Sequence, residues 1–491
     1  MAAALGLLLW MGGMGCEASV PGGPKTTSGP GVLVFAGSGQ GGDRLVIRAV
    51  GDVLLHGRLL RQGCARPERF RSLWRQVAPL LAAADIAYAN LEGPTAAGVT
   101  PDGEECSDPG LVPDGHVYSS DPSALNYPPA LLRDLAASGI DLVSTANNHA
   151  LDRGSLGVER TLEAARLAGL STSGTRAETT SSCYTMVTTR GFRLAWLACT
   201  FHTNGYADQD DQVQYCTRDL DSTVELVRSL AGRRDVDAVL VTPHWGPEYQ
   251  TRPDARQVRF AHAVLEAGAL AVIGAHPHVL QPPEKVLTRD GRETLVAYSL
   301  GNFVSGQLGL ARATSALLHL ELARDRQGLT RIREAVFVPL VMRHAPGASE
   351  VLLADPSVGD GTTRQALRLT ATVLGAGNLV LPAQASPGVP GQGPTTSPVT
   401  MAWRPVPSLA EPTVAPKVQA PPAVKPPDAV VEETGAGPED SSPDPDAGGD
   451  ELYTGKTVAA GTEGLTGPFG QEPTSDLAPE DADPKQTGPE W

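Results

Sequence analysis

Apolar and polar positions alternate in blocks from residue 44 onward, and these blocks predict strands and helices in turn. Short apolar, β-rich runs predict strands over residues 44–52, 86–93, 140–149, 192–200, 236–246 and 270–279. Helical spacing predicts helices over residues 69–85, the second half of 123–139, 155–169 with Ser155 as N-cap, 221–234 and 255–269. This order predicts an α/β layer fold with largely parallel central strands buried on both faces.

The end of this region follows a different pattern. Apolar runs over residues 293–304, 316–324 and 333–342 follow one another without long helices between them. They predict a second, antiparallel sheet region. Residues 97–120 form a long insertion without periodicity, for which we expect an irregular surface loop.

Composition separates a folded body from a tail. Residues 381–491 contain 5 Lys/Arg and 17 Asp/Glu, so they carry -12 of the formal net charge of -16. They are rich in Pro, Gly and Ser and lack apolar periodicity, which predicts a disordered, solvated spacer. Residues 44–345 are the predicted domain, and 346–380 its terminal segment. The body is nearly neutral, which excludes a basic nucleic-acid footprint.

The N-terminal residues indicate export. A short apolar run ends in small residues and Cys16, which resembles a bacterial lipoprotein signal over residues 1–16. The run is shorter than a membrane span requires, so we expect an export signal with a lipid anchor at a bacterial membrane. Residues 17–43, rich in Gly, Pro and Ser, predict a flexible tether.

Five cysteines remain when Cys16 is set aside. Cys199 lies within the apolar run LAWLACT, which predicts a buried thiol. The other four cysteines, which lie in polar surroundings, are Cys64, Cys106, Cys183 and Cys216. Export would permit them to form two disulfides, in any of three pairings.

Polar side chains stand where the predicted strands end. Asp52, with His56 nearby, follows the first strand, and the later strand ends carry Glu92, Asn147, Asn148, His149, His244, His276 and His278. Ligands bind at the carboxyl ends of strands in open α/β sheets. Imidazole with carboxylate and amide oxygen suits Mn, Fe or Zn. About seven candidates exceed the needs of one four-coordinate ion, which favours two divalent ions sharing a carboxylate.

Each residue also has a structural explanation. Asn148 could stabilise a turn, and His244 could be a hydrogen-bonded core or loop histidine. Asp52 could belong to an ordinary strand-end turn, and Glu92 could be a charge at a helix end or in a loop. His56 could simply begin a helix. His276 and His278 are harder to explain in this way, because residues two apart on an extended chain point to the same side.

Six ordered motifs carry a resemblance to a known family. GDVLLHG, NLEG, STANNHALDRG, TPHWGPEY, GAHPHVLQP and YSLGNFV, spread over about residues 44–345, resemble the CapA family of capsule and poly-γ-glutamate biosynthesis proteins. This family is a branch of the calcineurin-like metallophosphoesterases. The resemblance implies a four-layer α/β/β/α sandwich with a dinuclear site.

The resemblance also implies roles for individual residues. Asp52 would bind one ion, and Glu92 would lie near or between both. Asn148 and His244 would serve the second ion, with His276 and His278 completing the ligand set. His149 would be the general acid, oriented by Asp152, although a hydrogen-bonding role without proton transfer is the alternative. Arg176 and Glu248 are further candidates for substrate contact.

The chain departs from the wider phosphoesterase pattern at two places. The usual Asp-x-His is absent, because His56 stands four residues after Asp52, and NLEG replaces GDxxD. Two functions therefore remain open: a phosphoesterase acting on a phosphoester or exopolymer-related substrate, and a non-catalytic scaffold of a membrane-associated polymer-synthesis complex. A peptidase is less favoured, because no HExxH motif appears.

Overall fold

The computed structural model describes residues 31–36, 43–217, 220–356 and 360–380. The predicted signal segment and the whole range of the acidic tail lie outside these residues, as does most of the tether. Contacts divide the chain into residues 1–409 and 410–491, and all described residues belong to the first unit.

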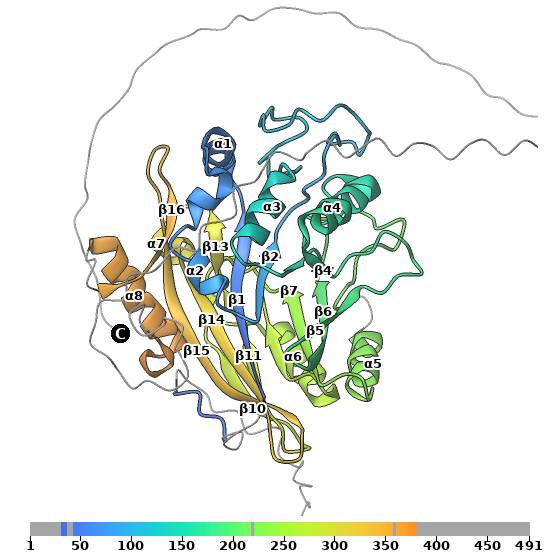
Figure 1. Ribbon diagram of the computed structural model, residues 1–491, viewed down its shortest axis with the longest axis vertical. Helices are drawn as coiled ribbons and strands as arrows, with labels where there is room; N and C mark the ends of the chain where they lie inside the picture. The colour runs from blue at the N-terminus through green and yellow to red at the C-terminus, as the bar shows by residue number, and fades with distance from the viewer. Residues whose placement is uncertain (1–30, 37–42, 218–219, 357–359, 381–491) are drawn as a thin grey trace, which may run out of the picture. The chain divides into compact units, whose positions relative to one another are not determined.

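Two sheets form the centre of the described body (Figure 1). The first has eight strands in the order β16-β15-β14-β1-β2-β3-β4, with β13 also paired to β1. Its strands are β1 (Arg44–Leu54), β2 (Ile86–Leu91), β3 (Leu142–Ser144), β4 (Ser171–Ser173), β13 (Asn302–Ser305), β14 (Thr314–Arg324), β15 (Thr330–Arg343) and β16 (Glu350–Leu353). The strands β1 to β4 are parallel, whereas β14, β15 and β16 are antiparallel to their neighbours.

The second sheet has six strands in the order β10-β11-β8-β7-β6-β5. They are β5 (Tyr184–Thr189), β6 (Phe192–Thr200), β7 (Ala238–His244), β8 (Ala271–Ile273), β10 (Glu284–Leu287) and β11 (Glu293–Ala297). Its central strands β6, β7, β8 and β11 are parallel. A small ribbon pairs β9 (Leu280–Gln281) with β12 (Ser299–Leu300).

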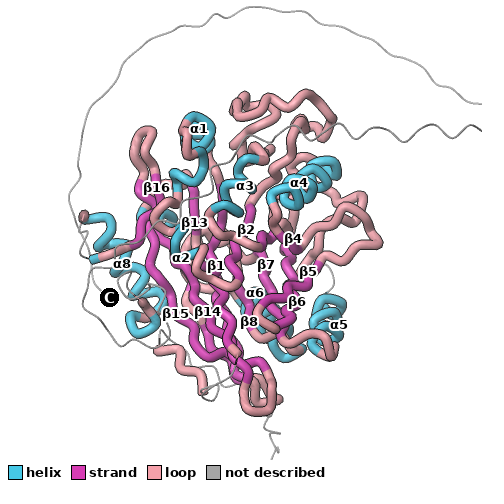
Figure 2. Tube along the Cα trace, viewed as in Figure 1, coloured by secondary structure: helices cyan, strands magenta, loops and turns pink. Residues whose placement is uncertain are grey.

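Helices cover the outer face of each sheet (Figure 2). The first sheet packs against α1 (Gly57–Ala65), the 3-10 helix η1 (Arg69–Leu73), α2 (Ala78–Leu81), α3 (Ala130–Ala137) and α4 (Gly154–Ala168). The second packs against α5 (Leu220–Ala231) and α6 (Ala255–Ala267). The described residues also include α7 (Leu310–Ala313), α8 (Gly361–Leu374) and η3 (Ala376–Asn378).

The space between the sheets is an apolar core. It includes Ile47 and Tyr88 from the first sheet and Trp196 and Leu240 from the second, all buried. The rings of Tyr88 and Trp196 lie 5.1 Å apart across it. With the helices outside, this core gives the predicted four-layer α/β/β/α sandwich, and the fold prediction is confirmed.

Local signals explain several element boundaries. The Asp254 carboxylate accepts hydrogen bonds from the amides of Arg256 and Gln257, and the Gln257 side chain accepts one from the Asp254 amide. This capping box starts α6. Gly169, with φ 78°, ends α4 in the left-handed conformation that glycine adopts readily.

Several predictions of local structure were wrong. The predicted helix over 69–85 is broken into η1 and α2, with Trp74 in neither. Ser155 does not cap α4, which begins one residue earlier after Arg153. The closing strands are antiparallel in part, as predicted for β14 and β15, but they do not form a separate sheet. β14 pairs with β1 and carries β15 into the first sheet, whereas β11 pairs with β8 of the second.

The described part of the predicted tether packs on the body. The amide of Leu33 donates to Asn378 Oδ1 at 2.7 Å, and Phe35 is 6% exposed within the inter-sheet core. Asn378 Nδ2 in turn donates to the Gly31 carbonyl at 2.8 Å. Residues 31–36 are therefore part of the domain rather than free spacer, because they bury apolar side chains and satisfy backbone groups.

Candidate metal centre

The first sheet delivers buried oxygen atoms to one edge. Asp52 lies near the end of β1, at an irregularity in its pairing with β2. A Cβ at Gly51 would lie 1.7 Å from the Gly301 carbonyl oxygen, so this position requires glycine. The Asp52 amide donates to the same oxygen at 3.1 Å. Close approach of two backbones therefore fixes the Asp52 carboxylate.

The second sheet delivers imidazoles to the same edge. His244 ends β7, and His276 and His278 follow β8. The His244 and His276 ring centroids are 4.6 Å apart. His278 Nδ1 lies 3.2 Å from Asp52 Oδ2, so atoms 226 positions apart in sequence are in contact.

The backbone conformation at His276 and His278 differs from the extended chain that the sequence predicted. Both were expected on an extended chain, but φ is 96° at His276 and 58° at His278. Their rings are 5.7 Å apart and tilted by 59°. Non-glycine residues with positive φ cluster at functional sites, where the surrounding structure holds them in place. The positive-φ backbone of the loop, rather than the alternation of side chains along a strand, therefore directs the His276 and His278 imidazoles toward the centre.

Ligand atoms converge in three overlapping groups. Glu92 with His244 and His276 forms one, Asp52 with Glu92 and His278 a second, and Glu248 with His276 and His278 a third. Within each group the ligand atoms lie within 4.8 Å of one another. The first two groups share Glu92, which is the arrangement that two ions with a common carboxylate would need.

Glu92 gives the clearest test of whether this set fits a cation. It is fully buried, and neither carboxylate oxygen accepts a hydrogen bond from any described residue. The nearest partners are His278 Nε2 at 3.6 Å and His244 Nε2 at 3.7 Å. A buried carboxylate without donors is costly unless it is paired or coordinates a metal. The donor set therefore fits divalent cations.

Burial and mutual charge set the protonation of the group. Burial raises the pKa of Glu92 well above its usual range, with repulsion from Asp52 adding to the effect and attraction to His278 opposing it. Burial and neighbouring imidazoles lower the pKa of His244 and His276 well below the usual range. Neutral imidazole is the form that binds metal, so these two are ready as ligands.

His278 differs from the other two histidines. Burial by itself lowers its pKa, but attraction to the Glu92 and Asp52 carboxylates outweighs this and raises the pKa to about 9. The His278 proton therefore occupies the place that a cation would take between these carboxylates.

The loop after β3 places three candidate residues beside the centre. Asn148 Oδ1 lies 2.8 Å from His244 Nε2. His149 Nδ1 lies 2.8 Å from Asp152 Oδ2, which also accepts the Leu125 amide at 2.9 Å. Since an ionised carboxylate only accepts, this contact puts the proton on Nδ1 and leaves Nε2 as the exchanging atom. The predicted contact between His149 and Asp152 is present, while their catalytic roles stay predictions.

The structure adds residues that the sequence analysis missed. Asn90 Nδ2 lies 2.8 Å from Asp52 Oδ1 and 3.2 Å from His244 Nδ1. Asn302 Oδ1 lies 3.0 Å from His278 Nδ1. Asn90 lies within β2 and Asn302 begins β13, so a rule based on the carboxyl ends of strands does not identify them. They hold ligands from both sheets in position.

The loop after β6 also reaches the centre. His202 lies 5.3 Å from the His276 ring, and Asn204 contacts both Asn148 at 3.2 Å and His149 at 3.4 Å. The strand-end rule would have found this loop, since FHTNG directly follows the predicted strand LAWLACT.

The three weaker candidates, Glu248, Arg176 and His56, differ in whether they contact the centre. Glu248 is exposed and takes part in the group with His276 and His278. Arg176 instead pairs with the Asp211 carboxylate and donates to its carbonyl at 2.7 Å. Among the described residues, no ligand group includes His56, whose Nδ1 accepts the Gly306 amide at 3.1 Å.

The cysteine prediction needs correction. Cys199 is not a free thiol but forms a disulfide with Cys216, and both are fully buried. A backbone contact explains the disulfide, because the Cys216 amide donates to the Thr200 carbonyl and holds the segment of Cys216 beside the end of β6. Cys64, Cys106 and Cys183 are free. Within the described part of the chain, no helix is both long and apolar enough to cross a membrane.

Comparisons with known proteins agree with this geometry. Residues 46–307 match the family described as bacterial capsule synthesis protein PGA_cap. The PGA biosynthesis protein CapA of Bacillus subtilis (strain 168) is 28% identical over 294 residues, covering 58% of this chain and 70% of that protein. The capsule biosynthesis protein CapA of Bacillus anthracis is 27% identical over 294 residues, covering 57% of this chain and 64% of that protein.

A solved structure has a weaker similarity. The NAD nucleotidase NadN of Haemophilus influenzae aligns with a TM-score of 0.38 and 13% identity, over 69% of this chain and 64% of NadN. We infer nothing further from that alignment. The family match covers more than half of the chain and includes every residue of the centre. The chain therefore belongs to the bacterial capsule synthesis protein family, PGA_cap, a branch of the metallophosphoesterase-like superfamily.

Proposed function

We propose that this chain is a metal-dependent phosphoester hydrolase of capsule or poly-γ-glutamate synthesis, with two divalent ions at the centre. The observation that carries the proposal is Glu92, a buried carboxylate shared by two ligand groups, whose oxygens accept no hydrogen bond from the described residues. Two such ions, drawn from Mn, Fe or Zn, supply Lewis-acid polarisation of a phosphoryl oxygen and activate a water nucleophile.

The residues of the chain would divide into holders and a proton donor. Asp52, Glu92 and His278 would hold one ion, and Glu92, His244 and His276 the other, in line with the two groups that share Glu92. Asn148 Oδ1, next to His244 Nε2, would add a neutral oxygen to the second set. Mixed oxygen and nitrogen donors without thiolate fit these metals.

His149 would give the leaving oxygen its proton. Its Nδ1 contacts Asp152 Oδ2, so Nε2 would be the atom that faces the leaving oxygen and exchanges a proton with it. The Asp152 carboxylate is 1% exposed and fixed by the Leu125 amide, so it can hold the ring in a single orientation. A positioned imidazole of this kind contributes about 10²- to 10⁴-fold to proton-transfer steps.

The biological setting is part of the proposal. The two CapA relatives are named for PGA and capsule biosynthesis, which supports an exopolymer-related phosphoester as substrate. Export and a lipid anchor at Cys16 would fit the N-terminal sequence pattern, and association with a polymer-synthesis complex would fit the resemblance to the CapA family. Those residues lie outside the described part of the chain.

Turnover by the full chain tests the proposal. Purified protein is stripped of metal, dialysed, and reloaded with Mn²⁺, Fe²⁺ or Zn²⁺ before assay on an aryl phosphate and a diaryl phosphodiester. We expect activity only after reloading, with about two ions bound per chain. Binding of metal without turnover of either substrate would favour the scaffold function, and failure to bind any of the three metals would contradict the dinuclear centre itself.

A further inference from the structure

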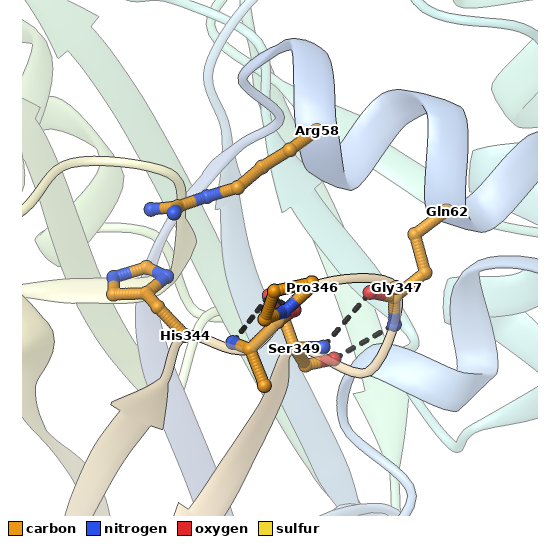
Figure 3. Close-up of a pocket in the computed structure, with 7 residues that line it drawn as sticks. Arg58, Gln62, His344, Pro346, Gly347 and Ser349 are labelled. Atoms are coloured by element: carbon orange, nitrogen blue, oxygen red, sulfur yellow. Dashed lines mark hydrogen bonds between the residues drawn. The ribbon is translucent and has the colours of Figure 1, made fainter.

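A cavity with a volume of about 220 Å³ lies between α1 and the loop that joins β15 to β16. Arg58 and Gln62 line it from α1, and residues 344–347 and Ser349 line it from the loop between β15 and β16. Figure 3 shows the Arg58 and His344 side chains reaching to the same side of this space from the two elements. We call it the basic cavity. It is several times larger than the roughly 30 Å³ that one water occupies.

The wall formed by the loop is rigid. Gln62 Nε2 donates to the Ser349 carbonyl at 2.8 Å, and Gln62 Oε1 accepts the Ser349 amide at 2.9 Å. Ser349 Oγ in turn donates to the Ala345 carbonyl at 2.9 Å. Gln62 and Ser349 are buried, so the loop is tied to α1 by a fully paired amide. The cavity is therefore built into the fold.

Positive charge in the basic cavity is not neutralised by the protein. Arg58 Nη2 donates to the Gly306 carbonyl at 2.7 Å, and its guanidinium forms no ion pair with a described carboxylate. The adjacent carboxylate, Glu350, already pairs with Arg75 and Arg343. His344 Nε2 donates to the Gln307 carbonyl at 3.0 Å, and its Nδ1 is buried without a partner among the described residues.

One short segment connects the basic cavity to the centre. Gly306 lies on the cavity side, because its carbonyl accepts a hydrogen bond from Arg58 while its amide donates to His56 Nδ1. Gln307 contacts both sides: its carbonyl accepts His344, while its Oε1 accepts Asn302 Nδ2 at 3.1 Å. Asn302 contacts the candidate ligand His278, so three successive hydrogen-bond contacts, from His344 to Gln307, Asn302 and His278, lead from the cavity wall to the centre.

We propose that the basic cavity is a subsite for a second oxyanion, a phosphate or carboxylate, of the molecule whose phosphoester lies at the centre. This rests on the proposed hydrolase function. A guanidinium without a carboxylate partner presents parallel N–H donors that match an oxyanion. The substrate class is then a phosphoester with a further anionic group.

Direct binding tests the subsite without turnover. The full chain, stripped of metal and dialysed, is titrated with inorganic phosphate by calorimetry. We expect Arg58→Gln to weaken phosphate binding at least tenfold, while Arg58→Lys retains most of it because the positive charge remains. Arg61→Gln is the matched control, since Arg61 lies on the same helix, is exposed and does not line the cavity. Thermal melting of each variant verifies folding. Equal binding by Arg58→Gln and Arg61→Gln, or no binding by the wild type, overturns the subsite.

A turnover series separates the two oxyanions. The reloaded enzyme is compared on an aryl phosphate, the same compound with a second phosphate, and the same compound with a carboxylate. We expect Arg58→Gln to raise KM about tenfold only for the compound whose second group the cavity binds. A uniform change in KM for all three would contradict the subsite. If no compound is hydrolysed but phosphate binding still depends on Arg58, the hydrolase proposal fails while the oxyanion site stands.

Discussion

The two sheets contribute different chemistry to the same edge. The first sheet and its loops supply oxygen from Asp52, Glu92 and Asn148, whereas the second supplies nitrogen from His244, His276 and His278. The two ligand groups that contain Glu92 each draw on both sheets. The centre therefore exists only where the sheets pack against each other, and the inter-sheet core is part of its construction.

The oxygen ligands of the first sheet and the imidazoles of the second also differ in how the surrounding structure positions them. Asp52 is positioned by a close approach of backbones at Gly51, within a continuous strand. His276 and His278 stand on a loop with positive φ, and their neighbours hold them there. Asn90 and Asn302 belong to the first sheet but contact His244 and His278 of the second. The oxygen side is thus preformed by the strands, and the nitrogen side depends on hydrogen bonds from across the interface.

Removing one imidazole should have the largest effect. His276→Ala takes a ligand from the group with Glu92 and His244, and we expect turnover to fall about 10³-fold, since a metal ion contributes several kcal/mol to phosphoryl transfer. Metal content measured by mass spectrometry should fall with it. His262→Ala is the matched control, because that imidazole on α6 pairs with Glu284 at 3.2 Å and belongs to no ligand group of the described residues. Equal metal content in both variants would contradict the assignment.

Removing the proton donor should leave the metal in place. For His149→Ala we expect turnover of an alkyl phosphate to fall about 10²-fold, because its leaving oxygen needs a proton. A nitrophenyl phosphate, whose leaving group is a weak base, should lose much less. Metal content should match the wild type. An equal loss on both substrates would point to a structural role for His149.

Metal affinity should rise with pH. The pKa of His278 is about 9 because the Glu92 and Asp52 carboxylates outweigh its burial, and the pKa of Glu92 is raised by burial. A cation must displace these protons, so affinity should increase by about tenfold per unit from neutral pH to about 9. Titrations of Mn²⁺ in buffers of different ionisation enthalpy measure the protons released. Affinity that does not change over this range would show that His278 is not displaced.

Removing one hydrogen bond between the two sheets should have the smallest effect on the metal centre. Asn302→Ala removes the contact with His278 Nδ1, and we expect metal affinity to fall about tenfold, as for other residues that orient a ligand. Turnover at saturating metal should change little. Asn126→Ala offers a comparison, since Asn126 is as deeply buried but bonds only to backbone groups of the insertion loop. If both variants lose affinity alike, the effect comes from folding.

Strand ends were the part of the site that sequence could predict. Asp52, Glu92, Asn148 and the three imidazoles follow apolar runs, and parallel strands bring such ends to a single edge. The buried runs also identified the layers, because strands covered on both faces read as continuous apolar segments.

The remaining features depend on tertiary contacts. Asn90 and Asn302 lie within strands, and only sheet packing brings them to the ligands. Cys199 reads as a core thiol because its partner arrives on a loop 17 residues away. The apolar run over residues 293–304 predicts a single strand, but β11 belongs to the second sheet and β13 to the first. Gly301, with φ 69°, turns the chain between β12 and β13.

Anomalous diffraction from crystals grown with Mn²⁺ tests the central claim most directly. The account predicts two peaks that share the Glu92 carboxylate, one also bounded by Asp52 and His278 and the other by His244 and His276. Peaks confined to the outer group of His319, Glu321 and Glu334, or no peak at the edge where the sheets meet, would contradict it.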